Sequence, residues 1–340
     1  MSARYRALAL QTACHAVNGC PDTPSARSAI RAAIDRIHAE VVASTQLAGP
    51  DVRLVVLPEY VLTGPPSTES VPEWAERAAL DPDGVEYQRL ADIAVDANVY
   101  LAVNNYETDE HFPGLYFQAC VLFGPDGTVR YRYRRLNSMW SVTPHDVLDR
   151  YLEVYGEEAL FPVADTEIGR IAPIASEEIL YPEIARCFAV RGAEIFAHSS
   201  SEVASALMTP KNVAKRARAI ENSAYVVSAN TAGVHGTALP FASGDGSSQV
   251  VDYRGNLLAA AAQGPSMAAN AELDLAGLRA FRRRVGMENM LARQRLDLYA
   301  STYGRYTIHP PNTVSGVPDR GFFRRIQQSV IDRLVADGVI

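Results

Sequence analysis

Residues 54–60 read LVVLPEY, a short apolar run that ends in a proline followed by a glutamate. A run of this length without alternating polar residues is typical of a strand buried on both faces in the middle of a parallel sheet. Open α/β sheets form their binding sites at the carboxyl ends of their strands, so Glu59 lies where a functional carboxylate is expected. The alternative is a surface acid at a strand end.

Extended and helical patterns follow one another on both sides of this run. Residues 5–12 are apolar enough for a buried strand, and residues 25–44 place isoleucines and a valine on one helical face. Further helices are expected over 86–97, 182–191 and 211–222, strands over 100–104, 171–175, 194–198, 225–230 and 271–274, and hairpins over 120–133 and around 252–256. This succession predicts a layered α/β domain.

The composition excludes several classes of protein. The net charge of -7 and the scattered basic residues disfavour nucleic acid or an anionic membrane as a partner. The first 12 residues lack the pattern of a signal peptide, and there is no apolar run of about 18 residues, so a cytoplasmic protein is expected. The four cysteines are too widely spaced for a disulfide framework or a metal site, and Cys187 is expected in the core. The chain has only two lysines, Lys211 and Lys215.

The pattern changes near the C-terminus. Residues 286–340 form a tail rich in arginine and tyrosine, with a Pro310-Pro311 break and a final amphipathic helix. We expect one domain over residues 1–285 and a tail over 286–340 that packs on the domain or on a second subunit, because the chain shows no internal repeat or clear linker.

A second strand end carries Ser176, followed by two glutamates. A serine at this place can be a nucleophile, a helix cap or a small polar residue in a turn. The residues alone leave these alternatives open.

Five motifs in order make the chain resemble the nitrilase (carbon-nitrogen hydrolase) superfamily. LVVLPEY is similar to the family's strand that ends in the general-base glutamate, and GRIAPIASEEILYPE at 169–183 is similar, without a gap, to the segment that carries the family's cysteine. Arg186 with 192–195, the helix 217–222 with 226–230, and Gly246 and Ser248 ahead of 250–252 continue the match. The resemblance spans about residues 5–275.

The resemblance implies a four-layer α-β-β-α sandwich, commonly paired into a homodimer or a higher homo-oligomer. The implied chemistry is hydrolysis of, or acyl transfer from, a nitrile, amide or carbamoyl C–N bond in a small molecule, without a cofactor or metal. In the family a cysteine thiolate attacks, a glutamate takes its proton and a lysine stabilises the oxyanion.

Carried over residue by residue, the family's three catalytic positions fall on Glu59, Tyr133 and Ser176. The lysine motif appears as YRYRRL at 131–136, which puts a tyrosine at the lysine position, and the cysteine position is a serine. No lysine precedes Thr209, so a shift in register does not restore the family pattern. Tyr60 and Glu178, beside the carried-over positions, are expected to bind substrate.

These replacements weaken the family chemistry. A serine hydroxyl is a weaker nucleophile than a thiol, and losing a cationic oxyanion partner costs on the order of 10²- to 10³-fold in rate. Arg132, Arg134 or Arg135 could restore the charge, but alternation along the strand predicts that Tyr133 faces the site. The family's second glutamate has no assigned counterpart in the helix-like insertion at 144–155, where Asp146, Asp149 and Glu153 are candidates.

Two functions follow from this comparison. The first is an enzyme that acts on a small amide-like substrate through Glu59, Tyr133 and Ser176. The second is a catalytically silent pseudoenzyme that binds a small molecule or a partner. An open pocket where the three side chains converge favours the enzyme, and a pocket filled by the insertion favours the silent scaffold.

Overall fold

The protein is described by a computed structural model that covers residues 4–205, 208–264 and 267–340. It contains two six-stranded sheets that pack face to face. The first has the order β14-β1-β3-β4-β5-β6, with bounds Met267–Asp274, Arg4–Gln11, Val52–Val56, Tyr100–Glu107, Phe117–Phe123 and Val129–Arg134. The second has the order β13-β12-β10-β9-β8-β7, with bounds Leu257–Ala260, Gln249–Val251, Tyr225–Asn230, Ile195–Ser200, Gly169–Ala175 and Ala164–Thr166.

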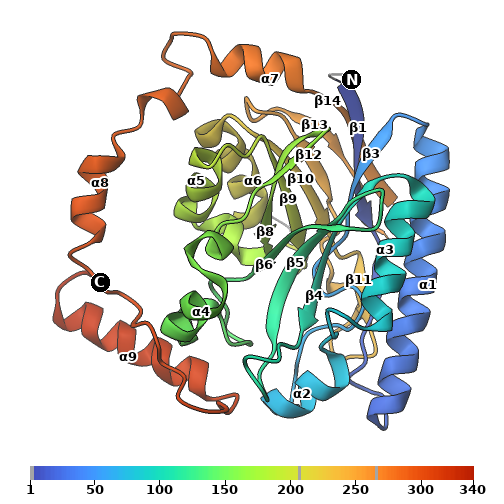
Figure 1. The fold of residues 1–340 in the computed structure, drawn as a ribbon, viewed down its shortest axis with the longest axis vertical. Coiled ribbons are helices and arrows are strands. Elements are labelled where there is room, and N and C mark those ends of the chain that lie inside the picture. Colours follow the sequence, from blue (N-terminus) through green and yellow to red (C-terminus); the bar gives the residue numbers. More distant parts are fainter. Residues whose placement is uncertain (1–3, 206–207, 265–266) are drawn as a thin grey trace.

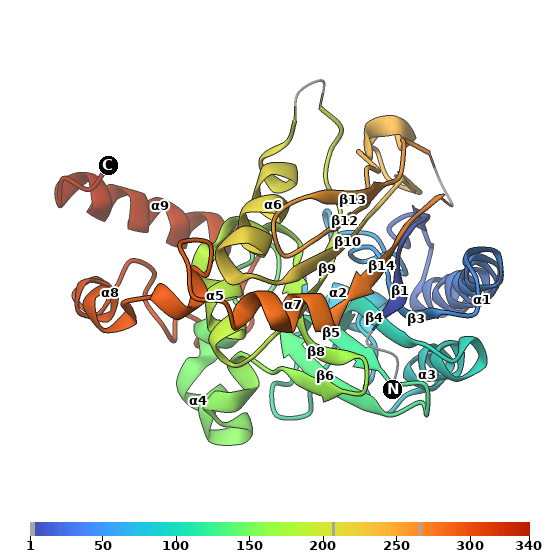
Figure 2. The ribbon, with the colours of Figure 1, turned by 90° about the horizontal axis from the view of Figure 1, so that it is seen from above.

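Helices cover the outer face of each sheet. Helices α1 (Thr23–Ala48) and α3 (Val85–Ala97) lie on one side of the pair of sheets, and α5 (Pro182–Val190) and α6 (Pro210–Asn222) lie on the other (Figure 1). The view from above shows these layers in succession (Figure 2). The expected four-layer α-β-β-α sandwich of the nitrilase type is therefore confirmed.

The LVVLPEY run shows why the layers form. Leu54 and Val56 belong to the core cluster that includes residues of both sheets, whereas Val55 and Leu57 belong to the cluster under α1 and α3. Side chains alternate across a strand, so a continuous apolar strand is stable only where both of its faces are covered. The strand β3 is parallel to both of its neighbours, β1 and β4.

Several short elements escaped the sequence patterns. They are β2 (Ala13–His15), which pairs with β11 (Gly233–His235), and the helices α2 (Val71–Ala78), α7 (Leu275–Arg282) and α8 (Leu296–Tyr303). Helix α2 begins with a capping box in which Ser70 and Glu73 bond to each other's backbone, and that serine-to-glutamate spacing was a readable signal. Eight-residue helices otherwise contain too few turns to show a clear period.

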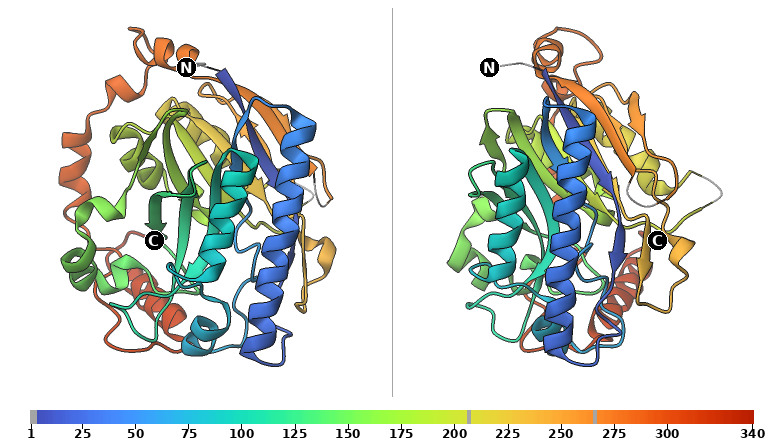
Figure 3. Two further views of the ribbon diagram at one scale, coloured as in Figure 1. Left: turned by 45° about the vertical axis from the view of Figure 1, so that its right-hand side comes forward. Right: turned by 90° about the vertical axis from the view of Figure 1, so that its right-hand side faces the viewer.

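The insertion lies close to the last part of the tail, and the tail reaches it along the side of the sandwich (Figure 1). The insertion forms α4 (Leu148–Tyr155) between the 3-10 helices η1 (Pro144–Val147) and η2 (Glu157–Leu160). In the tail, α8 and α9 (Phe322–Ala336) lie outside the layers (Figures 1 and 3), while Phe323 at the start of α9 is buried in the core cluster under α1 and α3. None of the helices in the described ranges is long and apolar enough to cross a membrane.

Candidate functional site

The carboxyl ends of strands from both sheets meet at one place. Glu59 follows β3 in the first sheet, and its backbone N–H donates to the carbonyl of Ser200 at the end of β9 in the second (3.2 Å). Ser176 follows β8, which pairs in parallel with β9. Glu59 and Ser176 therefore both lie beside the carboxyl end of β9, Glu59 on the first sheet and Ser176 on the second.

The Glu59 carboxylate is buried, and one of its oxygens is bonded to two neighbouring side chains. Its Oε1 accepts hydrogen bonds from Nε2 of Gln118 on β5 (2.9 Å) and from the guanidinium of Arg135 (3.2 Å). Gln118 also accepts from Arg135 through its Oε1 (2.6 Å). The family-type carboxylate is therefore held by a cation and an amide.

Arg135 supplies the fixed positive charge of this region. It is buried and pairs with Glu177 as well as with Glu59. Burial acts to lower its pKa, but the carboxylates of Glu177, Glu59 and Glu178 outweigh burial and raise it. A guanidinium stays charged in proteins, so the charge missing from the family's lysine position is present on a neighbouring residue.

Strand alternation separates Tyr133 from Arg132 and Arg134, but it does not separate Tyr133 from Arg135, which the sequence analysis had grouped with those two arginines. Arg132 and Arg134 point to the opposite face of β6 from Tyr133 and pair with Glu107, as alternation predicts. Arg135 lies two residues after Tyr133 and one residue beyond the end of β6, so the same alternation places it on the side of Tyr133. Alternation therefore does not exclude Arg135 from this region, and its guanidinium bonds Glu59.

Tyr133 lies deep between the sheets. Its side chain is completely buried, its hydroxyl donates to Oε2 of Glu178 (2.8 Å), and its ring meets Phe188 of α5 edge-on. Burial raises its pKa well above the ordinary value, so the phenol stays neutral. Because its only proton is given to Glu178, Tyr133 has no second donor for an oxyanion.

Glu178 belongs to the same buried network. It lies in the 3-10 helix η3 (Ser176–Leu180), and its Oε1 accepts from the backbone N–H groups of Leu136 (2.7 Å) and Asn137 (3.1 Å). Burial raises the pKa of Glu178 to about 7. Its contacts hold the segment after β6 in place. The side chain is buried, and its expected contact with substrate stays a prediction.

Ser176 adopts a backbone conformation that is rare for serine. Its φ is +50°, and its side chain is 3% exposed. Its carbonyl accepts a hydrogen bond from Nε2 of the buried His198 (2.9 Å), whose Nδ1 lies 2.8 Å from the hydroxyl of Ser228. A non-glycine residue in the left-handed region costs on the order of 1 kcal/mol and persists where the surroundings hold it, which is common at functional sites.

The Ser176 hydroxyl has a partner that the sequence analysis missed. Nζ of Lys211, in the first turn of α6, lies 3.1 Å from Oγ of Ser176. The signal in the sequence was the scarcity of lysine, because the chain's only two lysines both lie on this helix.

The three carried-over residues thus lie in one region with separate partners. Glu59 bonds Gln118 and Arg135, Tyr133 bonds Glu178, and Ser176 bonds Lys211. Across the described ranges, no hydrogen bond joins any two of the three. Glu177 and Glu178, which follow Ser176, connect it to Arg135 and Tyr133.

Tyr60, the other expected substrate-binding residue, is partly exposed. Its φ is +38°, and its backbone N–H donates to Oδ1 of Asn104 (3.2 Å). Burial of the hydroxyl, followed by the charge of Glu59, raises its pKa. Its hydroxyl is therefore a neutral donor beside Glu59.

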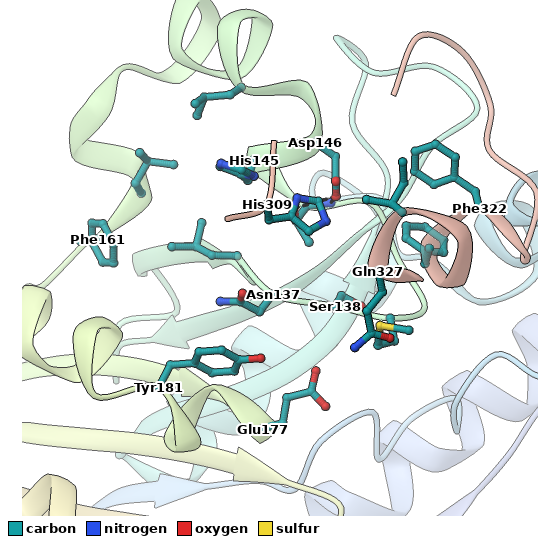
Figure 4. A pocket seen from close by; sticks show the side chains of 17 residues that line it. Asn137, Ser138, His145, Asp146, Phe161, Glu177, Tyr181, His309, Phe322 and Gln327 are labelled. Atoms are coloured by element: carbon teal, nitrogen blue, oxygen red, sulfur yellow. Dashed lines mark hydrogen bonds between the residues drawn. The ribbon is translucent and has the colours of Figure 1, made fainter. Parts of the chain in front are cut away.

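A cavity of about 730 Å³ adjoins the site (Figure 4). Its walls come from the segment after β6, the insertion, the tail and the start of α5, and include Asn137, Ser138, His145, Phe161, Glu177, Tyr181, His309, Phe322 and Gln327. Glu59, Tyr133 and Ser176 are not among its lining residues. Glu177 connects the cavity to the buried side chains of the site, because it lines the cavity and pairs with Arg135.

The three acids proposed as counterparts of the family's second glutamate differ in their surroundings. Asp146 lines the cavity, but its carboxylate accepts from the backbone and hydroxyl of Thr143 and from the hydroxyl of Thr313 in the tail. Asp149 and Glu153 are exposed on α4. Asp146 therefore ties the tail to the insertion.

The remaining expectations concern the cysteines and metal-binding groups. The four cysteines are free thiols, and Cys187 is partly buried on α5 instead of fully buried in the core. Within the described part of the chain, no group of three or more histidine, cysteine, aspartate or glutamate side chains could hold a metal ion.

Comparisons with known proteins agree with this fold. The model of the carbon-nitrogen hydrolase family matches residues 12–283. Omega-amidase NIT2 of Bos taurus is 25% identical over 247 residues, covering 73% of this chain and 84% of that protein. The human omega-amidase NIT2 is 24% identical over 180 residues, covering 53% of this chain and 63% of that protein. Among solved structures, Saccharomyces cerevisiae Nit3, a member of the nitrilase superfamily, superposes with a TM-score of 0.63 at 22% identity, over 84% of this chain and 95% of Nit3.

Proposed function

The chain belongs to the carbon-nitrogen hydrolase family, and on that basis we propose that it cleaves the C–N bond of a small amide-like substrate through a serine nucleophile. The observation that carries this proposal is Ser176, a buried serine held at positive φ where β8 ends. A nucleophile on a sharp turn at a strand end has its hydroxyl pinned in one direction, which is what attack on a carbonyl requires.

The remaining groups have separate roles in the proposal. Arg135 supplies positive charge beside Glu59, which the tyrosine at the family's lysine position does not. Tyr133 fixes Glu178, and Glu178 fixes the segment that leads into the cavity. Glu59 keeps the family carboxylate at the strand end opposite Ser176, and Tyr60 offers a hydroxyl beside it.

The reaction proposed is acyl transfer. Oγ of Ser176 forms a bond to the carbonyl carbon, the C–N bond breaks, and the nitrogen leaves with a proton as ammonia or an amine. Water or another acceptor then takes the acyl group from the serine, which gives hydrolysis or transfer. Because the mammalian relatives are named omega-amidases, a terminal amide is the first substrate class to test.

The test is a screen of the full chain against terminal amides, simple aliphatic amides and nitriles. Ammonia release and the intact protein mass are measured, with Ser176→Ala as the matched control. We expect release by the wild-type protein and loss of release, together with any acyl adduct, in the variant. Turnover that survives Ser176→Ala would sink the covalent mechanism.

A silent binding protein is the second candidate. The observation in its favour is that the cavity is walled by the insertion and the tail, while Ser176 itself lies outside the lining. Ligands that raise the melting temperature without any product, across the whole panel, would support this candidate against the first.

The assembly is also a proposal. We propose a homodimer or a higher homo-oligomer of a domain over 1–285, in which the tail over 286–340 completes the cavity or contacts the partner. Light scattering of the full chain tests it, and a monomeric mass would contradict it.

A further inference from the structure

We propose that Lys211 is the catalytic base that takes the proton of Ser176, which makes the two residues a serine–lysine pair. This inference rests on the proposed function and names the group that activates its nucleophile. Within the described ranges no hydrogen bond joins Glu59 to Ser176, whereas another side chain lies within hydrogen-bond distance of the serine hydroxyl.

The geometry singles out Lys211. Its Nζ lies 3.1 Å from Oγ of Ser176, and its other contact is the carbonyl of Ser201 at 3.5 Å. Throughout residues 4–205, 208–264 and 267–340, no carboxylate forms an ion pair with Lys211. A surface lysine commonly pairs with an acid or extends into water, whereas Lys211 is 9% exposed and directed at a hydroxyl.

The placement of both lysines supports a function. Lys211 and Lys215 are the only lysines in 340 residues, and both are buried on α6. Burial lowers the pKa of Lys215 to about 8. Lys215 donates to Oδ1 of Asn212 (2.8 Å) and does not contact Ser176, so Lys211 alone is placed to act on the serine.

The hydrogen bonds of the other candidates for the base go to groups other than the Ser176 hydroxyl. Glu59 is bonded to Gln118 and Arg135. Nε2 of His198 must carry a hydrogen, because its partner is the carbonyl of Ser176 and a carbonyl only accepts. His198 thus holds the backbone of Ser176 and does not touch its hydroxyl.

The proposed step balances as follows. Nζ of Lys211, as the free amine, accepts the hydroxyl proton while Oγ of Ser176 bonds to the carbonyl carbon. The resulting ammonium donates that proton to the leaving nitrogen as the C–N bond breaks. In the second half, Lys211 takes a proton from water as the water oxygen attacks the acyl-serine, and the proton returns to Oγ as the acid leaves.

A fluorophosphonate probe tests this pair without knowledge of the substrate. The probe bonds to an activated serine oxygen through phosphorus as fluoride leaves, and the added mass is located at Ser176 by peptide mapping. We expect Lys211→Met to slow labelling by about 10²-fold or more. Lys215→Met, a change of the same size on the same helix, is the matched control and should label within about threefold of the wild-type rate.

Two further variants separate proton transfer from charge and from folding. Lys211→Arg keeps a cation that cannot accept a proton, so labelling should stay slow if Lys211 is the base and should persist if only charge matters. In Lys211→Ala, added ethylamine should restore labelling in proportion to the concentration of its free-amine form, so rescue should rise with pH. A merely structural lysine would show neither effect.

The outcomes distinguish this inference from the proposed function. Equal labelling of wild type and Lys211→Met would overturn the role of Lys211 and leave the serine chemistry standing. Ammonia release from an amide without any labelling of Ser176 would overturn the pair and keep C–N cleavage. Neither labelling nor ammonia release by the wild-type protein would overturn both.

Discussion

Replacing Glu178 with glutamine should change how the stability of the protein depends on pH. In the folded protein Glu178 is fully buried and its pKa is raised to about 7, against 4.5 for an ordinary glutamate. The folded state therefore keeps the Glu178 proton between pH 4.5 and 7, where the unfolded chain has lost it. Glu178 contributes stability that is fully present below pH 4.5 and is lost as the pH rises to 7.

The size of this effect follows from the two pKa values. Each pKa unit corresponds to about 1.4 kcal/mol, so the loss between pH 4.5 and 7 is about 3 kcal/mol. Glutamine does not titrate, and its amide oxygen can still accept from the backbone of Leu136 and Asn137. Glu178→Gln should therefore keep the fold and remove this part of the pH dependence.

Urea unfolding at pH values between 4.5 and 8 measures the effect. The stability of wild type minus that of Glu178→Gln should fall by about 3 kcal/mol across this range. The exposed Glu157 provides the matched control, because Glu157→Gln should follow the wild-type curve. A difference that stays constant with pH, or that grows as pH rises, would refute the reasoning from burial.

Two further predictions concern the same network. Arg135→Met leaves two carboxylates without their buried cation and should lower the free energy of unfolding by about 3–5 kcal/mol in urea titrations. Arg150→Met, which removes one partner of an exposed ion pair, should lower it by less than about 1 kcal/mol. Similar losses in the two variants would contradict the burial argument. Tyr133→Phe removes the donor to Glu178 and should cost about 1–3 kcal/mol. Tyr131→Phe removes a buried hydroxyl that has no hydrogen-bond partner among the residues that the structure describes, and it should be close to neutral. Equal costs for the two phenylalanine variants would show that the Glu178 contact contributes little.

The strand ends could be predicted because their signals are local. A buried parallel strand must be apolar on both faces, so the apolar run before Glu59 can be recognised as such a strand from a few residues. Ser176 could be placed by a gap-free motif of 15 residues that spans strand, turn and helix start. Alternation within β6 correctly separated Tyr133 from Arg132 and Arg134.

The sequence by itself determined the layered fold, the places of Glu59, Tyr133 and Ser176, and the scarcity of lysine, because each depends on short-range patterns or on composition. Only the tertiary structure decided which partner each side chain has. Arg135 reaches Glu59 across 76 positions of sequence, and Lys211 reaches Ser176 across 35. Such contacts depend on how the segments after β3 and β6 come together and on how α6 packs beside η3, and no local periodicity encodes either. The feature that best explains how a serine could act here, a buried lysine on its hydroxyl, is therefore visible only in three dimensions.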